Sequence, residues 1–364
     1  MFSHIDPNNY DQQLSTKQQG MAQLFAQFNL PNFEVYRSDP IHYRQRAEFR
    51  VWHQADDLYY IMFDSTTKEK FKVVDFPVAS QLINQLMTAL LIEIKDKPVL
   101  RYKLFQVDFL TTLSGQALIS MLYHKPLDDD WQAQVNNLKA SLSSLAPLNI
   151  IGRSRKQKCV IDQDYVIEQL NVGQQTFQYQ QVENGFTQPN AKVNEKMLLW
   201  AQNATRDHGG DLIELYCGNG NFSIALAQNF DRVLGTEISK SSVKSAQFNI
   251  AVNNISNIDI VRMSSEEFSQ AMAGLRSFRR LADFDLTTYQ FDTVLVDPPR
   301  AGLDADSIVL ISKFQQIIYI SCNPNTLKDN LMELTKTHTI DRIALFDQFP
   351  YTHHIETGVI LTRK

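Results

Sequence analysis

The stretch "DLIELYCGNGNFSIALAQNFDRVLGTEI", residues 211–238, contains the pattern that decides the fold. A short apolar run is followed by a glycine-containing turn, an apolar helical stretch and a second apolar run that ends at Glu237. Strand, tight turn, helix and strand in this order predict a βαβ unit with two parallel strands. The stretch therefore indicates the beginning of a doubly wound α/β sheet.

The same alternation continues to the end of the chain. Helical stretches alternate with strand-like runs, among them "IDIVRM", "FDTVLVD", "IIYISCN", "RIALFDQF" and "ETGVILTRK". We predict a Rossmann-like α/β domain over residues 186–364, with its final two strands forming an antiparallel edge. The polar stretch "VENGFTQPN", residues 182–190, is expected to form the junction with the preceding domain.

The first half of the chain has a different rhythm. Strand-like runs come in pairs, and "KLFQVDFLTTL" and "ALISMLYHK" flank the hairpin-like turn "SGQ". Helical stretches are expected near residues 9–28, 78–95 and 129–145. Residues 1–185 are therefore predicted to form an α+β domain that contains an antiparallel sheet.

Composition limits the class of protein. The chain has 364 residues, of which 43% are hydrophobic, and this is enough for two domains with ordinary cores. We find no apolar run long enough to span a membrane, and the three cysteines show no CxxC spacing for zinc or an iron-sulfur cluster. A cytoplasmic monomer with reduced thiols and no bound metal is expected.

The net charge of −5 argues against indiscriminate binding of polyanions. Positive charge is nevertheless concentrated in "RSDPIHYRQRAEFR", residues 37–50, and in "GRSRKQK", residues 152–158. These segments fit contacts to one shaped RNA, and they equally fit two solvated faces. Arg44 and Arg50 are our candidates for RNA contacts. Phe105, Phe109 and Tyr43 are candidates for base stacking, although aromatic residues in strands more often belong to a core.

The loop after the first strand of the 211–238 stretch suggests a nucleoside-containing ligand. Gly218 and Gly220 allow a tight turn and close approach of a ligand to the backbone. Glu237 follows about twenty residues later, at a position where a carboxylate accepts ribose hydroxyls. Ser223 stands where a dinucleotide fingerprint has its third glycine, so S-adenosylmethionine fits better than a dinucleotide.

Three later segments bring reactive groups toward the same sheet edge. "VLVDPPRAGL" carries Asp297 and Arg300 on a loop that two prolines make stiff. The alternative interpretation is that the prolines only terminate the strand. Cys322 ends the strand-like run "IIYISC", where a small core residue is the default interpretation. Glu356 begins the last strand-like run.

A thiol and a carboxylate at one cofactor site suit C5 methylation of uracil, in which a thiolate adds at C6 and a base removes the C5 proton. Either Arg300 or the cofactor sulfonium is expected to lower the pKa of the thiol.

Five ordered motifs now identify a resemblance. "FTQPN", "ELYCGNGNFS", "VDPPRAGL", "YISCNP" and "HHIETGV" resemble the S-adenosylmethionine-dependent RNA uracil-5 methyltransferases. "HYRQRAEFRVWH", "FPVASQLINQLM", "RYKLFQVDFLTTLSGQA" and "IDQDY" further resemble the bacterial tRNA (uracil-5-)-methyltransferases. The resemblance covers nearly the whole chain. It implies a class I methyltransferase domain after an RNA-binding domain, with the T-loop uridine of tRNA, position 54, as substrate.

The resemblance also implies roles for individual residues. Cys322 would be the nucleophile and Glu356 the proton acceptor. The positions that would contact the cofactor S-adenosyl-L-methionine are Gln188, Tyr216, Asn221, Glu237 and Asp297, and the glycine turn adds Gly218 and Gly220. Arg44, Arg50, Phe105 and Arg300 are the candidates for contacts with the T-arm.

Two other functions remain open from the sequence. One is the same chemistry on ribosomal RNA or on another RNA with a T-like loop. Relatives that act on ribosomal RNA commonly carry an iron-sulfur cluster, and the cysteines for one are missing here, which favours tRNA. The other is an RNA-binding or tRNA-folding protein in which methylation matters little.

Overall fold

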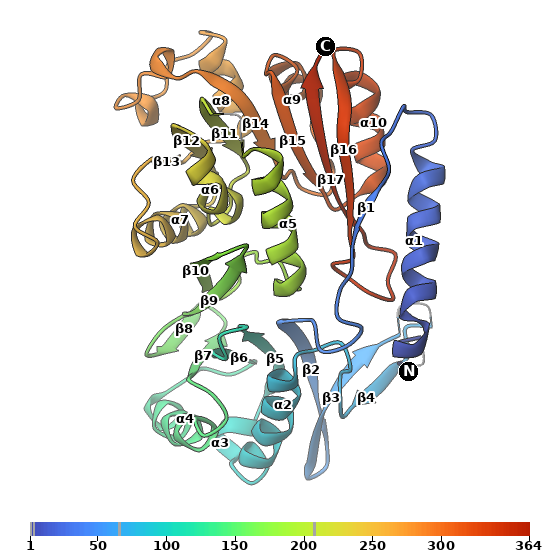
Figure 1. The fold of residues 1–364 in the computed structure, drawn as a ribbon. Coiled ribbons are helices and arrows are strands. Elements are labelled where there is room, and N and C mark those ends of the chain that lie inside the picture. The colour runs from blue at the N-terminus through green and yellow to red at the C-terminus, as the bar shows by residue number, and fades with distance from the viewer. Residues whose placement is uncertain (1, 3, 65–66, 207–208) are drawn as a thin grey trace. The chain divides into compact units, whose positions relative to one another are not determined.

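The computed structural model describes residues 2, 4–64, 67–206 and 209–364. Its contacts divide the chain into two compact units (Figure 1). The first unit comprises Met1–Pro7, Asp39–Gln169 and Gln180–Ala191. The second comprises Asn8–Ser38, Leu170–Tyr179 and Lys192–Lys364. Each unit is therefore assembled from three separate segments of the chain.

The first unit contains a seven-stranded sheet with the order β4-β3-β2-β5-β6-β7-β8. Neighbouring strands are antiparallel except β6 and β7, which are parallel. The strands are β2 (Arg46–Gln54), β3 (Asp57–Phe63), β4 (Lys70–Val73), β5 (Leu104–Thr111), β6 (Ala117–Tyr123), β7 (Leu148–Ser154) and β8 (Gln157–Ile161). The helices are α2 (Gln81–Ile94), α3 (Pro98–Arg101) and α4 (Asp129–Leu142).

Alternation of side chains explains how this sheet forms one core. Along β2, Phe49 and Val51 are buried, whereas Arg50 and Trp52 between and after them are exposed. The buried face packs against α2 and α4 in one hydrophobic cluster. Close packing requires Gly152 on β7, because a Cβ there would lie 2.2 Å from the ring of Trp131. The predicted α+β class with an antiparallel sheet is confirmed, as is the hairpin between β5 and β6.

A two-stranded sheet follows, made of β9 (Tyr165–Val172) and β10 (Gln175–Val182). Leu170–Tyr179, at its turn end, belongs by its contacts to the second unit. Within that unit the side chain of Asn253 bonds both the N–H and the C=O of Gln178, at 2.9 and 2.7 Å. This end of the hairpin is therefore part of the packing of the second unit.

The second unit contains an eight-stranded sheet with the order β1-β16-β17-β15-β14-β11-β12-β13. Its strands are β1 (Glu34–Tyr36), β11 (Asp211–Leu215), β12 (Arg232–Thr236), β13 (Ile258–Val261), β14 (Phe291–Val296), β15 (Gln316–Ser321), β16 (His338–Phe346) and β17 (Glu356–Arg363). Its helices are α1 (Tyr10–Leu24), α5 (Ala191–Ala204), α6 (Asn221–Leu226), α7 (Lys240–Val252), α8 (Ser265–Met272), α9 (Ala305–Ile311) and α10 (Pro324–Leu334).

The order of the strands fixes where a ligand site can form. β11 pairs in parallel with β12 on one side and with β14 on the other, so the winding of the chain reverses between β11 and β14. In doubly wound sheets the crevice at such a reversal, beyond the carboxyl ends of the strands, is the usual ligand site. The predicted Rossmann-like class is confirmed. A ligand site is therefore expected at the carboxyl ends of β11, β12, β14 and β15.

Two sequence expectations differ from the structure at the end of the sheet. The final strand β17 is not at an edge, because it inserts between β15 and β16 and is antiparallel to both. The edge is instead β1, whose Glu34–Tyr36 pairs in parallel with Ala344–Phe346. Residues 8–38 consequently belong to the second unit by their contacts, whereas a boundary at residue 185 had assigned them to the first. In the described part of the chain no helix is both long and apolar enough to cross a membrane.

Candidate active site

The loop after β11 has an unusual backbone. Tyr216, Gly218 and Gly220 have φ angles of 63°, 58° and 83°, in the left-handed region. A Cβ at Gly220 would approach Ile224 Cδ1 to 3.2 Å, whereas one at Gly218 would meet no atom within 4 Å. Tyr216 is a rare non-glycine residue in this region, and its hydroxyl lies 2.6 Å from Ser265 Oγ. The loop therefore leaves open space beside the backbone of Gly218, where a ligand can approach.

Glu237 is held beside this space by the backbone. The N–H of Gly218 donates to Oε2 at 3.0 Å, and the N–H of Ser239 donates to Oε1 at 2.6 Å. Each carboxylate oxygen keeps a further acceptor position, because an ionised carboxylate accepts about four hydrogen bonds. The side chain is half-buried at the carboxyl end of β12. This arrangement fits a ligand that brings paired hydroxyl donors, such as a ribose.

Asn221 and Gln188 have other surroundings. The amide of Asn221 pairs with that of Asn194 on α5 through two hydrogen bonds, of 2.9 and 3.0 Å. Its side chain thus joins α6 to α5 within the second unit. Gln188 lies in the segment Gln180–Ala191, which the contacts group with the first unit. Cofactor contacts from these two residues stay predictions.

Glu214 is a buried carboxyl that sequence reasoning missed. It lies in the interior of β11 at 1% exposure, and Ser223 Oγ on α6 donates to its Oε2. Burial, which is the main cause, and the charge of Asp297 together raise the pKa of Glu214 to about 8. Glu214 thus ties the first strand to the first helix. The sequence does contain a signal for it, because Glu214 is the one charged residue in the apolar run "LIELYC".

The loop that follows β14 is anchored to α10. Gly302, with φ of 78°, lies against α10, since a Cβ there would meet Asn330 Oδ1 and Thr326 Cβ at 3.0 Å. Asn330 Oδ1 accepts the N–H of Leu303 at 3.0 Å. The Nδ2 of Asn323, the N-cap of α10, donates to the C=O of Arg300 at 3.0 Å. These bonds hold the Asp-Pro-Pro-Arg loop next to the end of β15.

Cys322 and Glu356 meet across β15 and β17. The antiparallel register pairs Ile320 with Gly358 and Ser321 with Thr357. The ladder ends there: Cys322 follows β15 in a bend, Glu356 is the first residue of β17, and the two lie near enough for the charge of Glu356 to raise the pKa of Cys322. Cys322 is half-buried and Glu356 is buried. Within the described residues, Glu356 Oε2 is a buried oxygen with no hydrogen-bond partner.

Acidic groups crowd this end of the sheet. Burial, Glu356 and Asp297 raise the pKa of Cys322 to about 11, while the Arg300 guanidinium acts in the opposite direction. Burial raises the pKa of Asp297 to about 7, and burial together with Asp297 raises the pKa of Glu356. Each ionised acid therefore disfavours the charge on the next. A positive charge entering the site would favour the thiolate and the carboxylates together.

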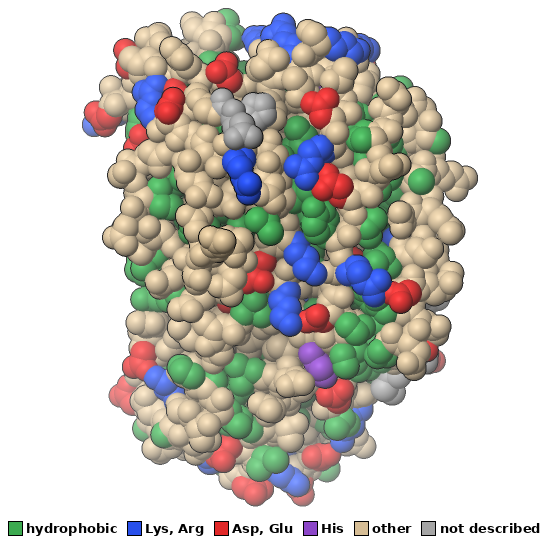
Figure 2. Space-filling model, in the orientation of Figure 1, with side chains coloured by type: hydrophobic (Ala, Val, Ile, Leu, Met, Phe, Trp, Pro, Cys, Tyr) green, Lys and Arg blue, Asp and Glu red, His purple; other side chains and the backbone are tan. Residues whose placement is uncertain are grey.

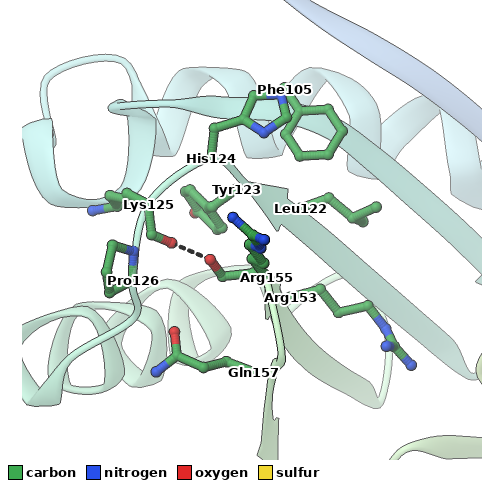
Figure 3. Close-up of a pocket in the computed structure, with 10 residues that line it drawn as sticks. Phe105, Leu122, Tyr123, His124, Lys125, Pro126, Arg153, Arg155 and Gln157 are labelled. Atoms are coloured by element: carbon green, nitrogen blue, oxygen red, sulfur yellow. Dashed lines mark hydrogen bonds between the residues drawn. The ribbon is translucent and has the colours of Figure 1, made fainter.

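In the first unit, Arg50 and Phe105 form part of an aromatic and basic site. The Phe105 ring stacks on the ring of His124 with centroids 3.8 Å apart and planes 8° apart, and the Arg50 guanidinium lies 5.6 Å from the Phe105 centroid. Phe105 and His124 line one side of a cavity of about 810 Å³ that Lys125 and Arg155 also line (Figure 3). Sequence reasoning missed His124, which follows β6 and whose N–H donates to the C=O of Lys103, two residues before Phe105.

The other RNA candidates of the first unit differ in availability. Tyr43 and Phe109 are buried at 5% and 1% exposure, so their rings belong to the interior and are not platforms for bases. Arg44 is half-buried, its Nε donates to the C=O of Arg46 at 2.6 Å, and it lies at the turn that leads into β2. These contacts support a structural contribution for Arg44, and its contact with RNA stays a prediction.

The basic segment 152–158 is partly neutralised by acids that lie elsewhere in the sequence. Arg153 donates to Glu183 Oε2 at 2.6 Å. Lys158 lies 3.3 Å from the same carboxylate and 2.5 Å from Asp164 Oδ2. On the face shown in Figure 2, basic and acidic side chains are interspersed except for a basic area near the C-terminus. This face therefore does not present a broad positive field.

A comparison with models of protein families shows which family the chain belongs to. The family model described as tRNA (Uracil-5-)-methyltransferase matches residues 9–364. The chain belongs to this family. The resemblance expected from the five motifs is thereby confirmed.

Curated relatives within the family are close. A protein of Colwellia psychrerythraea named tRNA/tmRNA (uracil-C(5))-methyltransferase is 73% identical over 364 residues, which is 100% of both chains. A protein of Shewanella baltica with the same name is 59% identical over 360 residues, 99% of each chain. The crystal structure of Pyrococcus abyssi tRNA (uracil-54, C5)-methyltransferase with S-adenosyl-L-homocysteine superposes with a TM-score of 0.73 at 19% identity, covering 97% of this chain and 84% of that one. This last likeness supports the shared fold.

Proposed function

We propose that this family member transfers a methyl group from S-adenosyl-L-methionine to C5 of the T-loop uridine of tRNA, uridine 54, and forms 5-methyluridine in the cytoplasm. The single observation that carries the proposal is the proximity of Cys322, which follows β15, to Glu356, which begins β17, and of both to Asp297. A thiol and a base close together, next to a cofactor loop, are the two groups that C5 methylation of uracil requires.

The cofactor site is proposed at the reversal between β11 and β14. Glu237 would accept the ribose hydroxyls, and the open space beside Gly218 would admit the nucleoside. Tyr216 and Asp297 complete the edge of the site, and Gln188 and Asn221 remain candidates for further contacts. When bound, the cofactor supplies an electrophilic methyl group on a positively charged sulfur. This charge suits an edge that carries Asp297, Glu356 and Cys322.

The chain's own groups then perform two steps on the uracil. The sulfur of Cys322 forms a bond to C6, and the electron pair of the C5–C6 double bond moves to C5 and O4, so that C5 becomes nucleophilic and takes the methyl group. Glu356 next removes the proton from C5. The released electron pair re-forms the C5–C6 double bond and expels the thiolate of Cys322. The count starts with Cys322 as the thiolate and Glu356 as the carboxylate, the two forms that the positive charge of a bound cofactor favours. The thiolate is returned at the end, and the one proton that leaves C5 ends on Glu356.

The reaction is tested by trapping its covalent intermediate. A T-arm hairpin that carries 5-fluorouridine at the target position should form a stable complex with the protein, because C5 then holds fluorine where Glu356 must remove a proton. Denaturing electrophoresis with labelled RNA and labelled methyl cofactor measures the complex, and peptide mapping finds the attached residue. We expect RNA and methyl label together on the peptide that contains Cys322. Methyl transfer to ordinary hairpin without any trapped complex would contradict the mechanism.

For the first unit we propose that Arg50, Phe105 and His124 bind the T-arm. The exposed part of the stacked Phe105–His124 pair offers an aromatic edge to an unstacked base, and Arg50 adds a cation beside it. Methylation of a uridine inside the folded elbow requires extrusion of the base, which costs a few kcal/mol of stacking. A protein surface that stacks on displaced bases offsets part of this cost.

Substitution of Phe105 by alanine should weaken binding of the T-arm by about 1–3 kcal/mol, the usual contribution of one stacked base. Fluorescence anisotropy with a labelled hairpin at fixed salt measures the dissociation constant. Tyr102→Ala is the matched control, because Tyr102 is an exposed aromatic residue of the same unit that also lies under a lysine, Lys103. Equal affinity of the wild-type protein, Phe105→Ala and Arg50→Ala would remove this site from the proposal.

The names of the close relatives point to a second substrate for the same site. Both names include tmRNA. We therefore favour, as the second substrate, an RNA other than tRNA that carries a T-like arm. Initial rates on isolated hairpins from tRNA, tmRNA and ribosomal RNA, with labelled methyl cofactor, separate the substrates. A role in RNA folding apart from methylation would require RNA remodelling that survives Cys322→Ser.

A further inference from the structure

Lys17 on α1 is a buried cation with an uncommon set of partners. Its side chain is 9% exposed, and the side chain of its partner Asp347 is 0% exposed. The ammonium donates to Asp347 Oδ1 at 2.7 Å, to the C=O of Phe349 at 2.8 Å and to the C=O of His354 at 3.1 Å. All three protons are therefore directed at one segment, residues 347–354, and they bind it near both of its ends.

Two more side chains of α1 contact the same segment. The hydroxyl of Tyr10 and Nε2 of Gln13 donate to Asp347 Oδ2 at 2.9 and 2.8 Å. Gln13 Oε1 accepts the N–H of Tyr351 at 3.2 Å. Residues 10, 13 and 17 lie on one face of a helix, because their spacing follows its repeat. One face of α1 thus fixes the conformation of this segment.

The segment leads directly to the proposed base. β16 ends at Phe346 and β17 begins at Glu356, and these two residues are opposite each other in the antiparallel register. The connection between them has no helix or strand, and Tyr351 within it has a φ of 62°. His354, whose carbonyl Lys17 binds, precedes Glu356 by two residues. The ammonium therefore acts on the backbone immediately before the side chain that must reach C5.

Stability alone does not account for this arrangement. Transfer of an ammonium and a carboxylate out of water costs several kcal/mol per ion, and well-packed apolar residues often replace such a pair without loss. Burial lowers the pKa of Lys17, and the neighbouring Asp347 opposes this shift. A buried ion pair does specify one geometry, since its hydrogen bonds are directional.

We propose that Lys17 is a positioning residue for Glu356: through residues 347–355 it sets the orientation of this carboxylate, so that removal of the C5 proton depends on helix α1. The inference rests on the proposed function, in which Glu356 is the base. It adds a residue from the start of the chain to the reaction. It also makes a specific kinetic claim, because proton removal follows methyl transfer and only the later step should be slowed.

The test compares two rates in the full-length protein. With a T-arm hairpin and labelled methyl cofactor, rapid quench gives the rate of methyl transfer, and denaturing electrophoresis gives the decay of the methylated adduct. For Lys17→Met we expect adduct decay to slow about tenfold, because a displacement of about 1 Å at a catalytic group costs up to 10²-fold. Methyl transfer should change less than about twofold. Asp11→Asn is the matched control, since it removes an exposed ion pair of the same helix with Arg37.

A second variant separates positioning from folding. Lys17→Met alone leaves the carboxylate of Asp347 buried without its cation, which destabilises the protein. The double variant Lys17→Met with Asp347→Asn removes both charges and should recover most of the melting temperature. It should still accumulate methylated adduct, because the carbonyls of Phe349 and His354 both lose the hydrogen bond from the Lys17 ammonium. Lys17→Arg, which keeps a buried cation, should restore part of the decay rate.

The outcomes distinguish this inference from the function on which it rests. If adduct accumulated in Glu356→Gln, but neither in Lys17→Met nor in the double variant with Asp347→Asn, the positioning role alone would be overturned. An equal loss of both rates in the Lys17 variants would also overturn it, since a merely structural residue slows every step. Absence of adduct in Glu356→Gln would overturn the assignment of Glu356 as the base and this inference with it.

Discussion

Replacement of Cys322 by serine should lower uridine methylation by roughly 10⁴-fold or more, the size of loss that follows removal of a covalent nucleophile. The hydroxyl of serine is a far weaker acid than a thiol, and it does not supply the anion that adds to C6. The fold should remain intact, because Cys322 is half-buried and the two side chains are similar in size. Single-turnover methyl transfer to a T-arm hairpin measures the loss.

Two controls make the Cys322 result specific. Cys159→Ser changes another half-buried thiol, located on β8 of the first unit, and should leave the rate within about twofold. RNA affinity of Cys322→Ser, measured with the cofactor product present, should match that of the wild-type protein. A Cys322→Ser protein that still methylates at even one per cent of the wild-type rate would show that the thiol is not the group that adds to C6.

Substitution of Glu356 by glutamine should have the second-largest effect, and a different one. Turnover should fall by about 10²–10⁴-fold, the usual contribution of a general base. The first step should survive, because loss of the Glu356 charge removes one of the causes that raise the pKa of Cys322. The enzyme should therefore stop after methyl transfer and accumulate a covalent RNA adduct that carries the methyl group.

The measurement for Glu356→Gln is the amount of doubly labelled complex on denaturing gels. A time course should show a burst of adduct close to one per enzyme and then little product release. Glu333→Gln, on the surface of α10, is the matched control and should behave as the wild-type protein does. If Glu356→Gln released methylated RNA at the normal rate, another group would have to remove the C5 proton.

Local patterns were sufficient to predict much of the second unit. The alternation of strands and helices after residue 190 and the glycine turn after β11 are encoded within short windows, and the structure confirms the parallel sheet that they imply. The proximity of Cys322 to Glu356 also agrees with their predicted places at strand ends, whereas their roles stay predictions. Patterns of this kind depend only on residues that are neighbours in the sequence, so they can be recognised from a single sequence.

Contacts between distant segments were not predictable in the same way. Nothing near residue 34 signals that Glu34–Tyr36 will pair with β16, because three residues carry almost no periodicity. The segment 152–158 looked purely basic, yet Glu183 pairs with its Arg153. Nothing in the sequence near Lys17 signals its pairing with Asp347, 330 positions later. Pairings of this type are set by the tertiary fold.

The contribution of residues 8–38 to the second unit has a consequence for synthesis. Tyr10 bonds Asp347, 337 positions later, and β1 requires β16 before it can pair. At ribosomal rates of about 5–20 residues per second, α1 and β1 wait on the order of 20–70 s for these partners. The strands of residues 39–169 have all their sheet neighbours much earlier. We therefore expect the nascent chain to complete its first sheet while its own beginning is still unpaired, and closure of the catalytic sheet to be the last event of folding.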